Sequence, residues 1–390
     1  HLSIRRQRQM CIRDSYISTV IFFIAFLCVS GLTLATNLES EASVVAVGDN
    51  LIHPEVYNDA KTGKNSFDFK PMYEPVKKDI QNADIAYVNQ ESPLGGDDRP
   101  YHGFKRFNTP SSVAQDLVDT GFNFVNGSNN HAMDQGESGI NNSIHTWDKF
   151  KDKVLFTGVF NSQEARDEIP TKTVNGIKVS MLSYTFGTNG IKPSHPYTIN
   201  TFDETQIKKD VKEAKKQSDA VIVSAHWGNE GHHMENKTQE RYAKVFADAG
   251  VDVVLGMHPH VIEPVKWVKG KDGNKTLVAY SLGNFLNGQA TGNESNDLLG
   301  RLNFKLVKNP KGVKVENVKW RSMVNHYELA NVYDKNSKKD FKIYPLHDYT
   351  DKLAEKHGLH YVNGANMTKE RLQDITKEVI DKEFLDDESL

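Results

Sequence analysis

The chain has no cysteine after Cys28. Its only other cysteine, Cys11, also lies near the start of the 390-residue sequence. The main part of the chain therefore has no thiol with which to form a disulfide and no thiolate with which to bind a metal ion. A metal site there must use histidine, aspartate, glutamate or asparagine side chains.

The sequence also lacks an excess of either charge. It has 48 Lys and Arg against 51 Asp and Glu, a net charge of -3, and both signs are spread along the chain. A nucleic-acid-binding surface requires a cationic excess, so no nucleic-acid partner is expected. Hydrophobic residues make up 38 % and charged residues 25 %, which is typical of a globular protein with a sizeable core.

Charged residues are absent from residues 16–35. A stretch of about 20 apolar residues can span a bilayer, so this segment is predicted to be a transmembrane anchor or a signal segment. Its end, Thr33-Leu34-Ala35, also suits signal peptidase. Arginines precede the segment, and Glu39 and Glu41 follow it. These charges predict a single-pass protein of the cell membrane with an extracellular main domain, or a secreted protein if the segment is cleaved.

Residues 1–15 weaken this prediction of orientation. They begin without Met, and HLSIRRQRQMCIRDS resembles translated sequencing adaptor more than a natural leader. If they are an artefact, the arginines that support the predicted orientation do not belong to the protein.

From Ser43 onward, short apolar runs alternate with amphipathic segments, which predicts an α/β protein. Strands are predicted at 44–49, 84–91, 122–130, 154–158, 177–186, 220–228 and 251–260. Helices are predicted near 73–82, 111–119, 137–149, 204–216 and 237–249.

After residue 276 the pattern changes to successive β segments with few helices between them. The last residues read as one polar helix, with Thr368 as its N-cap, and an acidic tail. The main domain is therefore predicted at 43–345, and a polar helical C-terminal tail at 346–390.

Polar side chains recur at the ends of five predicted strands. They are Asp49, with His53 four residues on; Asn89 and Glu91; Asn130 and His131; His226, with Glu230 nearby; and His258 and His260. The carboxyl ends of strands in an open α/β sheet deliver side chains to one crevice. Taken singly, Asp49 could be a turn residue and His226 a buried core histidine, but their coincidence favours a shared polar site.

Among these strand ends, His258-Pro259-His260 gives the most specific indication of a metal site. On an extended chain, side chains two residues apart point to the same side, so both imidazoles could reach one metal centre.

Six motifs in this order resemble those of the CapA family of poly-γ-glutamate capsule biosynthesis, also called PgsA-type proteins. They are GDNLIH, VNQES, NNHAMDQG, HWGNE, GMHPH and YSLGNF, between Ser43 and Phe285. That family is related to the calcineurin-like metallophosphoesterases. The resemblance implies a metallophosphoesterase-like αββα sandwich of two sheets flanked by helices, here with a β-rich C-terminal extension.

The resemblance also implies roles for single residues. Metal ligands would be Asp49 and His260 at a first metal, Asn130, His226 and His258 at a second, and Glu91 as the bridge in place of the superfamily's usual aspartate. His131 would contact the substrate oxyanion or protonate the leaving group, with Asp134 orienting a neighbouring imidazole or amide. His53, Asn89 and Glu230 are further supporting or substrate-contacting candidates.

This chain departs from the superfamily pattern at two points. The first motif usually has Asp and His two residues apart, but here Leu51 occupies that position and the nearest histidine is His53. Glu91 is one methylene longer than the aspartate it replaces. The site is therefore expected to hold one or two divalent ions, and its N/O ligands suit Mn, Fe or Zn.

Such a site favours anions and would support phosphoester hydrolysis. Arg106 is a candidate anion contact, although a solvated arginine is the plainer reading. Two functions follow. One is an outside-facing capsule protein that works with membrane synthase subunits and binds the anionic polymer. The other is an active metal-dependent phosphoesterase on an extracellular or cell-wall phosphoester. An adhesion module, a third reading, predicts no metal.

Overall fold

The computed structural model describes residues 39–289, 293–362 and 365–390. The predicted localisation in the cell membrane is corrected by this structure, because no helix among these residues is long and apolar enough to cross a bilayer. Residues 1–15 and the predicted anchor or signal segment at 16–35 lie outside the described residues.

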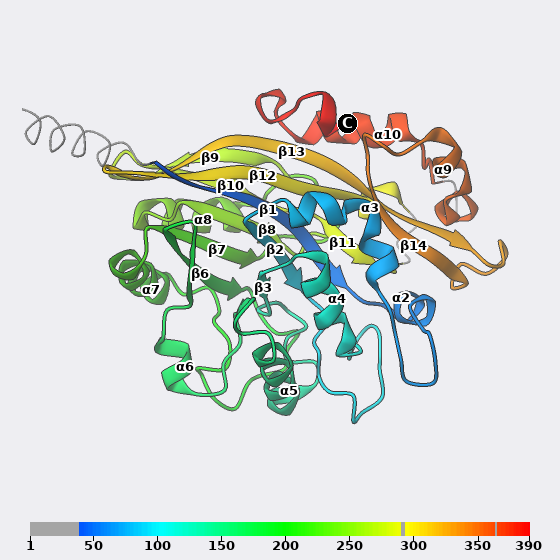
Figure 1. Ribbon diagram of the computed structural model, residues 1–390, viewed down its shortest axis with the longest axis horizontal. Helices are drawn as coiled ribbons and strands as arrows, with labels where there is room; N and C mark the ends of the chain where they lie inside the picture. Colours follow the sequence, from blue (N-terminus) through cyan, green and yellow to red (C-terminus); the bar gives the residue numbers. More distant parts are fainter. Residues whose placement is uncertain (1–38, 290–292, 363–364) are drawn as a thin grey trace, which may run out of the picture.

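Two β-sheets form the centre of the molecule (Figure 1). The first has the order β14-β13-β12-β1-β2-β3-β4, with β11 also paired to β1. Its strands are β1 (Ser40–Leu51), β2 (Ile85–Gln90), β3 (Phe124–Asn126), β4 (Leu155–Thr157), β11 (Asn284–Asn287), β12 (Leu298–Asn309), β13 (Gly312–Leu329) and β14 (Lys338–Pro345). Strands β1 to β4 run parallel, and β12 to β14 are antiparallel additions beside β1.

The second sheet has the order β5-β6-β7-β8-β10-β9. Its strands are β5 (Thr171–Val174), β6 (Ile177–Thr185), β7 (Ala220–His226), β8 (Val253–Met257), β9 (Val265–Lys269) and β10 (Lys275–Ala279). The helices are α2 (Pro54–Asp59), α3 (Lys70–Gln81), α4 (Ser112–Thr120), α5 (Gly136–Asp148), α6 (Gln163–Asp167), α7 (Glu204–Gln217), α8 (Lys237–Ala249), α9 (Asp351–Lys356) and α10 (Lys369–Val379).

Alternation along the strands separates the layers. In β1, Val44 and Ala46 belong to the core between the sheets, whereas Val45 and Val47 pack with residues of α3 and α4 on the outer face. The strands of the second sheet alternate in the same way, toward the first sheet or toward α7 and α8. Because side chains of a strand point alternately to its two faces, this pattern gives four layers. The predicted fold, two sheets flanked by helices with a β-rich C-terminal region, is confirmed.

Predicted and observed elements agree best where periodicity is strong. The five helices predicted near 73–82, 111–119, 137–149, 204–216 and 237–249 correspond to α3, α4, α5, α7 and α8. Two of the β segments predicted after residue 276, VKVENVKW (313–320) and YELANVY (327–333), are joined in one strand, β13, which ends at Leu329. Residues 321–324 between them stay paired with β12, and 325–326 pair with β14. Strands β5, β9 and β14 and the short helices α2 and α6 were not predicted.

Residues 346–390 are amphipathic rather than simply polar. Leu372 and Ile375 of α10 join the core that also contains Trp320 and Val324 of β13. Arg321 of β13 donates to both carboxylate oxygens of Asp386, at 2.6 and 3.1 Å. The C-terminal helices thus cover the part of the first sheet formed by β12 and β13 (Figure 1).

Because Ile375 is 2 % exposed, Ile375→Ala should lower the free energy of unfolding by about 2–5 kcal/mol. Urea denaturation followed by circular dichroism measures this change. Lys377→Ala, on the exposed side of the same helix, should stay within about 0.5 kcal/mol of the wild type. Equal stability of both variants would show that the C-terminal helices do not share the cooperative core.

Candidate metal centre

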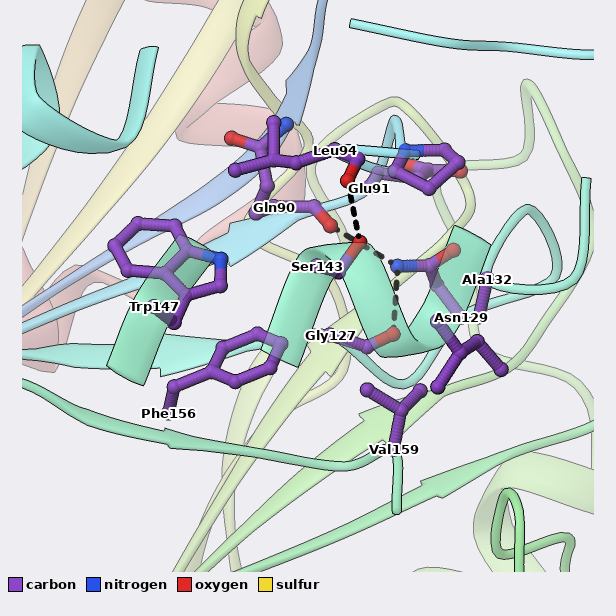
Figure 2. Close-up of a pocket in the computed structure, with 12 residues that line it drawn as sticks. Gln90, Glu91, Leu94, Gly127, Asn129, Ala132, Ser143, Trp147, Phe156 and Val159 are labelled. Atoms are coloured by element: carbon purple, nitrogen blue, oxygen red, sulfur yellow. Dashed lines mark hydrogen bonds between the residues drawn. The ribbon is translucent and has the colours of Figure 1, made fainter. Parts of the chain in front are cut away.

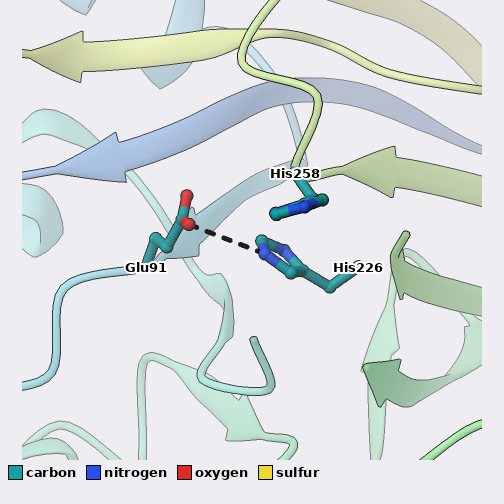
Figure 3. Close-up of side chains that lie close together, drawn as sticks. All are labelled: Glu91, His226 and His258. Carbon is teal, nitrogen blue, oxygen red and sulfur yellow. Dashed lines mark ion pairs between the residues drawn. The ribbon is translucent and has the colours of Figure 1, made fainter. Parts of the chain in front are cut away.

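Carboxylates and imidazoles converge where strands of both sheets end. Among the described residues, three groups could hold a metal ion, each with its ligand atoms within 4.8 Å of one another. They are Asp49, Glu91 and His260; Glu91, His226 and His258; and Glu230, His258 and His260. Shared members join these groups, and their five buried residues, Asp49, Glu91, His226, His258 and His260, are called the strand-end cluster here. Figure 3 shows Glu91 facing His226, with His258 beside it.

Glu91 is the central carboxylate of this cluster. It is fully buried, and neither of its oxygens has a hydrogen-bond partner. Its Oε1 lies 3.6 Å from His226 Nε2 and 3.7 Å from His260 Nε2. Burial, and then the neighbouring Asp49, raise the pKa of Glu91 well above its ordinary value. A buried carboxylate that meets imidazoles but no donor is a fitting ligand for a divalent cation, so the residues fit a metal centre.

The histidines differ in their charge preference. Burial lowers the pKa of His258 to about 3 and that of His226 well below its ordinary value, which favours the neutral imidazole that binds metals. The Nδ1 atoms of both are buried without a hydrogen-bond partner. Burial acts on His260 in the same direction, but Glu91 and Asp49 outweigh it and raise its pKa to about 10. The two carboxylates thus favour a proton on His260, whose single charge offsets part of theirs.

Asp49 is oriented by a row of amides on neighbouring strands. Asn126 of β3 donates to Asn89 of β2 at 2.8 Å, and Asn89 donates to Asp49 Oδ1 at 2.7 Å. The second oxygen of Asp49 accepts the backbone N–H of His258 at 3.2 Å. Asn89 therefore lies behind the cluster, where it positions a carboxylate.

The loop after β3 brings Asn130 to the cluster. Asn130 Oδ1 lies 2.9 Å from His226 Nε2, and its amide nitrogen donates to Asn189 Oδ1 at 3.2 Å. The loop is fixed in part by Asn129, which donates to the carbonyl of Gln90 at 3.2 Å beside a small cavity next to Glu91 (Figure 2).

His131 has its Nδ1 atom 2.8 Å from Asp134 Oδ2. Its ring meets Phe107 edge-on, with ring centroids 4.8 Å apart. Because Asp134 accepts the Nδ1 proton, Nε2 is the nitrogen left for a substrate. The structure therefore places Asp134 where it orients this imidazole.

His258 and His260 converge on the cluster, but not through an extended segment. Their φ angles are 100° and 56°, in a region that residues other than glycine rarely adopt. The predicted convergence is seen, whereas the geometric reason given for it is wrong. A bent backbone, not strand alternation, directs both rings.

The remaining candidates lie at the margins. His53 is in none of the three ligand groups, and its ring packs edge-on against Phe107 at 5.1 Å. Glu230 is exposed, yet its carboxylate reaches the group of His258 and His260. Arg106 is exposed, and among the described residues its side chain has no hydrogen bond or ion pair. The ligand and catalytic roles of these residues stay predictions.

Asn284 was not predicted as a site residue, although it lies within the YSLGNF motif. Its Oδ1 is 2.9 Å from His260 Nδ1, so His260 Nε2 is left to face Glu91. Its amide nitrogen donates to Gln289 Oε1 at 2.8 Å. Lys338 of β14 in turn donates to the carbonyls of Gly288 and Gln289, at 3.0 and 2.6 Å.

Two facing sheets flanked by helices, with histidine, carboxylate and amide side chains at their strand ends, define a layered α/β protein with a candidate metal centre. Within this class, the chain belongs to the family described as bacterial capsule synthesis protein PGA_cap, whose model matches residues 43–289. The resemblance to CapA proteins is thereby confirmed.

Two relatives carry related names. "PGA biosynthesis protein CapA" of Bacillus subtilis (strain 168) is 34 % identical over 173 residues, which cover 44 % of this chain and 44 % of that protein. "Capsule biosynthesis protein CapA" of Bacillus anthracis is 26 % identical over 288 residues, 70 % of this chain and 68 % of that protein. The chain thus spans less than half the length of the first and about two thirds of the second.

Among solved structures, a phosphatase from Mycoplasma pneumoniae is similar over 74 % of this chain and 95 % of its own, with a TM-score of 0.45 and 13 % sequence identity.

Asn284→Ala should weaken metal binding by about 10- to 100-fold, because it frees the His260 ring to turn away from the cluster. Calorimetric titration with Mn²⁺ or Zn²⁺ measures this affinity. Asn336→Ala, at an exposed asparagine in the β13–β14 turn, is the control and should bind like the wild type. Unchanged affinity in Asn284→Ala would mean that the backbone and Asp49, whose Oδ2 is 3.2 Å from His260 Nδ1, fix this ring without Asn284.

Proposed function

We propose that this chain is a metal-dependent phosphoesterase that works in the synthesis of a poly-γ-glutamate capsule. Membership of the capsule synthesis family supports the biological role. The observation that supports this chemistry is the buried carboxylate of Glu91. Neither of its oxygens has a hydrogen-bond partner, and the carboxylate faces both His226 and His260.

The donor set accommodates one or two ions. Asp49, Glu91 and His260 form one group, and Glu91, His226 and His258 the other, so Glu91 is common to both. Asn130 adds an amide oxygen beside His226. Nitrogen and oxygen donors of this kind suit Mn, Fe or Zn. Such ions, when bound, polarise a phosphoryl oxygen and lower the pKa of water towards neutrality.

The chain's own residues then supply position and protons. His131 is held by Asp134 through Nδ1, so its Nε2 can donate a proton to a departing alkoxide or bind the substrate oxyanion. Two carboxylates cannot neutralise two divalent cations, and the site therefore suits an anionic substrate. A phosphoester is the proposed substrate, and the anionic polymer and synthase subunits are the proposed partners.

A second candidate function, polymer binding without hydrolysis, is favoured by the position of His53. Leu51 replaces the histidine expected two residues after Asp49, and His53 lies outside the ligand groups. A first site with fewer ligands could hold one ion and bind carboxylates without turnover.

A measurement of metal content distinguishes both candidate functions, which need a bound metal ion, from the alternative of a protein that binds no metal. We expect the purified chain to hold one or two divalent ions, measured by plasma mass spectrometry after incubation with Mn, Fe or Zn, because both Glu91 oxygens and the Nδ1 atoms of His226 and His258 are buried without a hydrogen-bond partner. His258→Ala/His260→Ala should lose them. His145→Ala, which changes an exposed histidine of α5, should keep them. A folded wild-type chain without metal would contradict the proposal.

His131→Ala should lower kcat for an aryl phosphate by about 10²- to 10⁴-fold, while the metal content stays that of the wild type. Steady-state kinetics with a saturating divalent metal test this. A wild-type chain that binds polyglutamate and metal but hydrolyses no phosphoester would favour the second candidate function.

A further inference from the structure

Two phenylalanine side chains are exposed beside the strand-end cluster. Phe104 is 72 % and Phe186 49 % exposed, and both rings contact a histidine of the site. An exposed aromatic ring at a binding site offers a large apolar surface that gains contact only when a ligand arrives.

Phe186 follows the end of β6 in the second sheet. Its ring centroid is 4.6 Å from that of His258 and 6.3 Å from that of His226, with the latter rings nearly parallel. Its backbone N–H donates to the His226 carbonyl at 3.0 Å. One part of the ring therefore packs on the imidazoles of the cluster, while about half of its surface remains open.

Phe104 lies on the loop that connects β2, a strand of the first sheet, to helix α4. Its ring is 6.5 Å from the His131 ring at an interplanar angle of 75°. Because His131 is the proposed proton donor to the leaving group, Phe104 lies on the side where that group departs. Lys105 and Arg106 beside it are also exposed.

The two rings therefore approach the site from different sheets. Asn189 links their surroundings, since it is three residues after Phe186 and its side chain accepts from Asn130. Phe186 borders the histidines at the ends of β7 and β8, and Phe104 borders His131. The side-chain nitrogen of Asn189 lies 3.4 Å from His131 Nδ1, so the loop that carries Phe186 reaches the imidazole that Phe104 borders.

We propose that Phe104 and Phe186 form a leaving-group subsite that takes phosphomonoesters whose leaving group carries an aromatic ring or another flat apolar face. This inference rests on the proposed phosphoesterase function. Offset and edge-to-face contacts with a flat ring give each phenylalanine a favourable geometry. A small alkyl group would bury little of either ring.

The test compares two inert analogues, phenylphosphonate and methylphosphonate, in calorimetric titrations of the metal-loaded chain. Phe104→Ala and Phe186→Ala should each weaken phenylphosphonate binding by about three- to tenfold and leave methylphosphonate binding within about twofold. Phe186→Tyr should restore phenylphosphonate binding. The control is Tyr333→Ala, which removes a 95 % exposed ring in the β13–β14 turn and should change neither affinity.

Metal content is measured for every variant, so that loss of the cluster is distinguished from loss of the subsite. If Phe186→Ala no longer binds metal, the phosphonate affinities of Phe186→Leu and Phe104→Ala are compared with the wild type instead. Unchanged phenylphosphonate binding, or equal losses for both analogues with full metal content, would overturn the subsite. Failure of the wild type to hydrolyse any phosphoester while it still prefers phenylphosphonate would overturn the hydrolase instead.

Discussion

A carboxylate that is fully buried without a hydrogen-bond donor needs a compensating positive charge, and Glu91 is such a group. The arrangement around it follows from this need. His226 and His260 reach it from the ends of two different segments, and Asp49 adds a second carboxylate. A positive centre stabilises both carboxylates at once, whereas protonation, which the raised pKa of Glu91 favours, neutralises only that residue. A proton on His260 or a divalent ion between the groups meets that requirement.

Neutral amides hold this charged centre in place. Asn126 and Asn89 fix Asp49, Asn130 meets His226, and Asn284 meets His260. An amide can orient a ligand through one oxygen or one nitrogen without adding charge to a buried site. A charged neighbour would compete with a bound metal ion or repel it. His131 differs, because Asp134 holds it and a carboxylate can stabilise the imidazolium form that proton transfer requires.

Local pattern predicted the alternation of strands and helices and the polar residues at the strand ends, whereas the two-sheet sandwich and the ligand roles came from the resemblance to a known family. Local pattern did not predict how His258 and His260 meet, since their positive φ angles arise from packing around a bend. It missed Asn284 because a single amide has no spacing that distinguishes a ligand-orienting role from a turn. His53 illustrates the converse: proximity in sequence to Asp49 does not bring its ring into the cluster.

The C-terminal extension reaches the site although the family match ends at residue 289. Lys338 is 7 % exposed, lies 4.4 Å from the centroid of the Tyr327 ring and donates to two consecutive carbonyls of the loop that carries Gln289. Gln289 accepts from Asn284, which orients His260. Burial of an ammonium is costly unless its protons are bonded, so these carbonyls and Lys338 fix each other. A candidate ligand of the centre, His260, therefore depends, through three contacts, on a strand that the family match does not include.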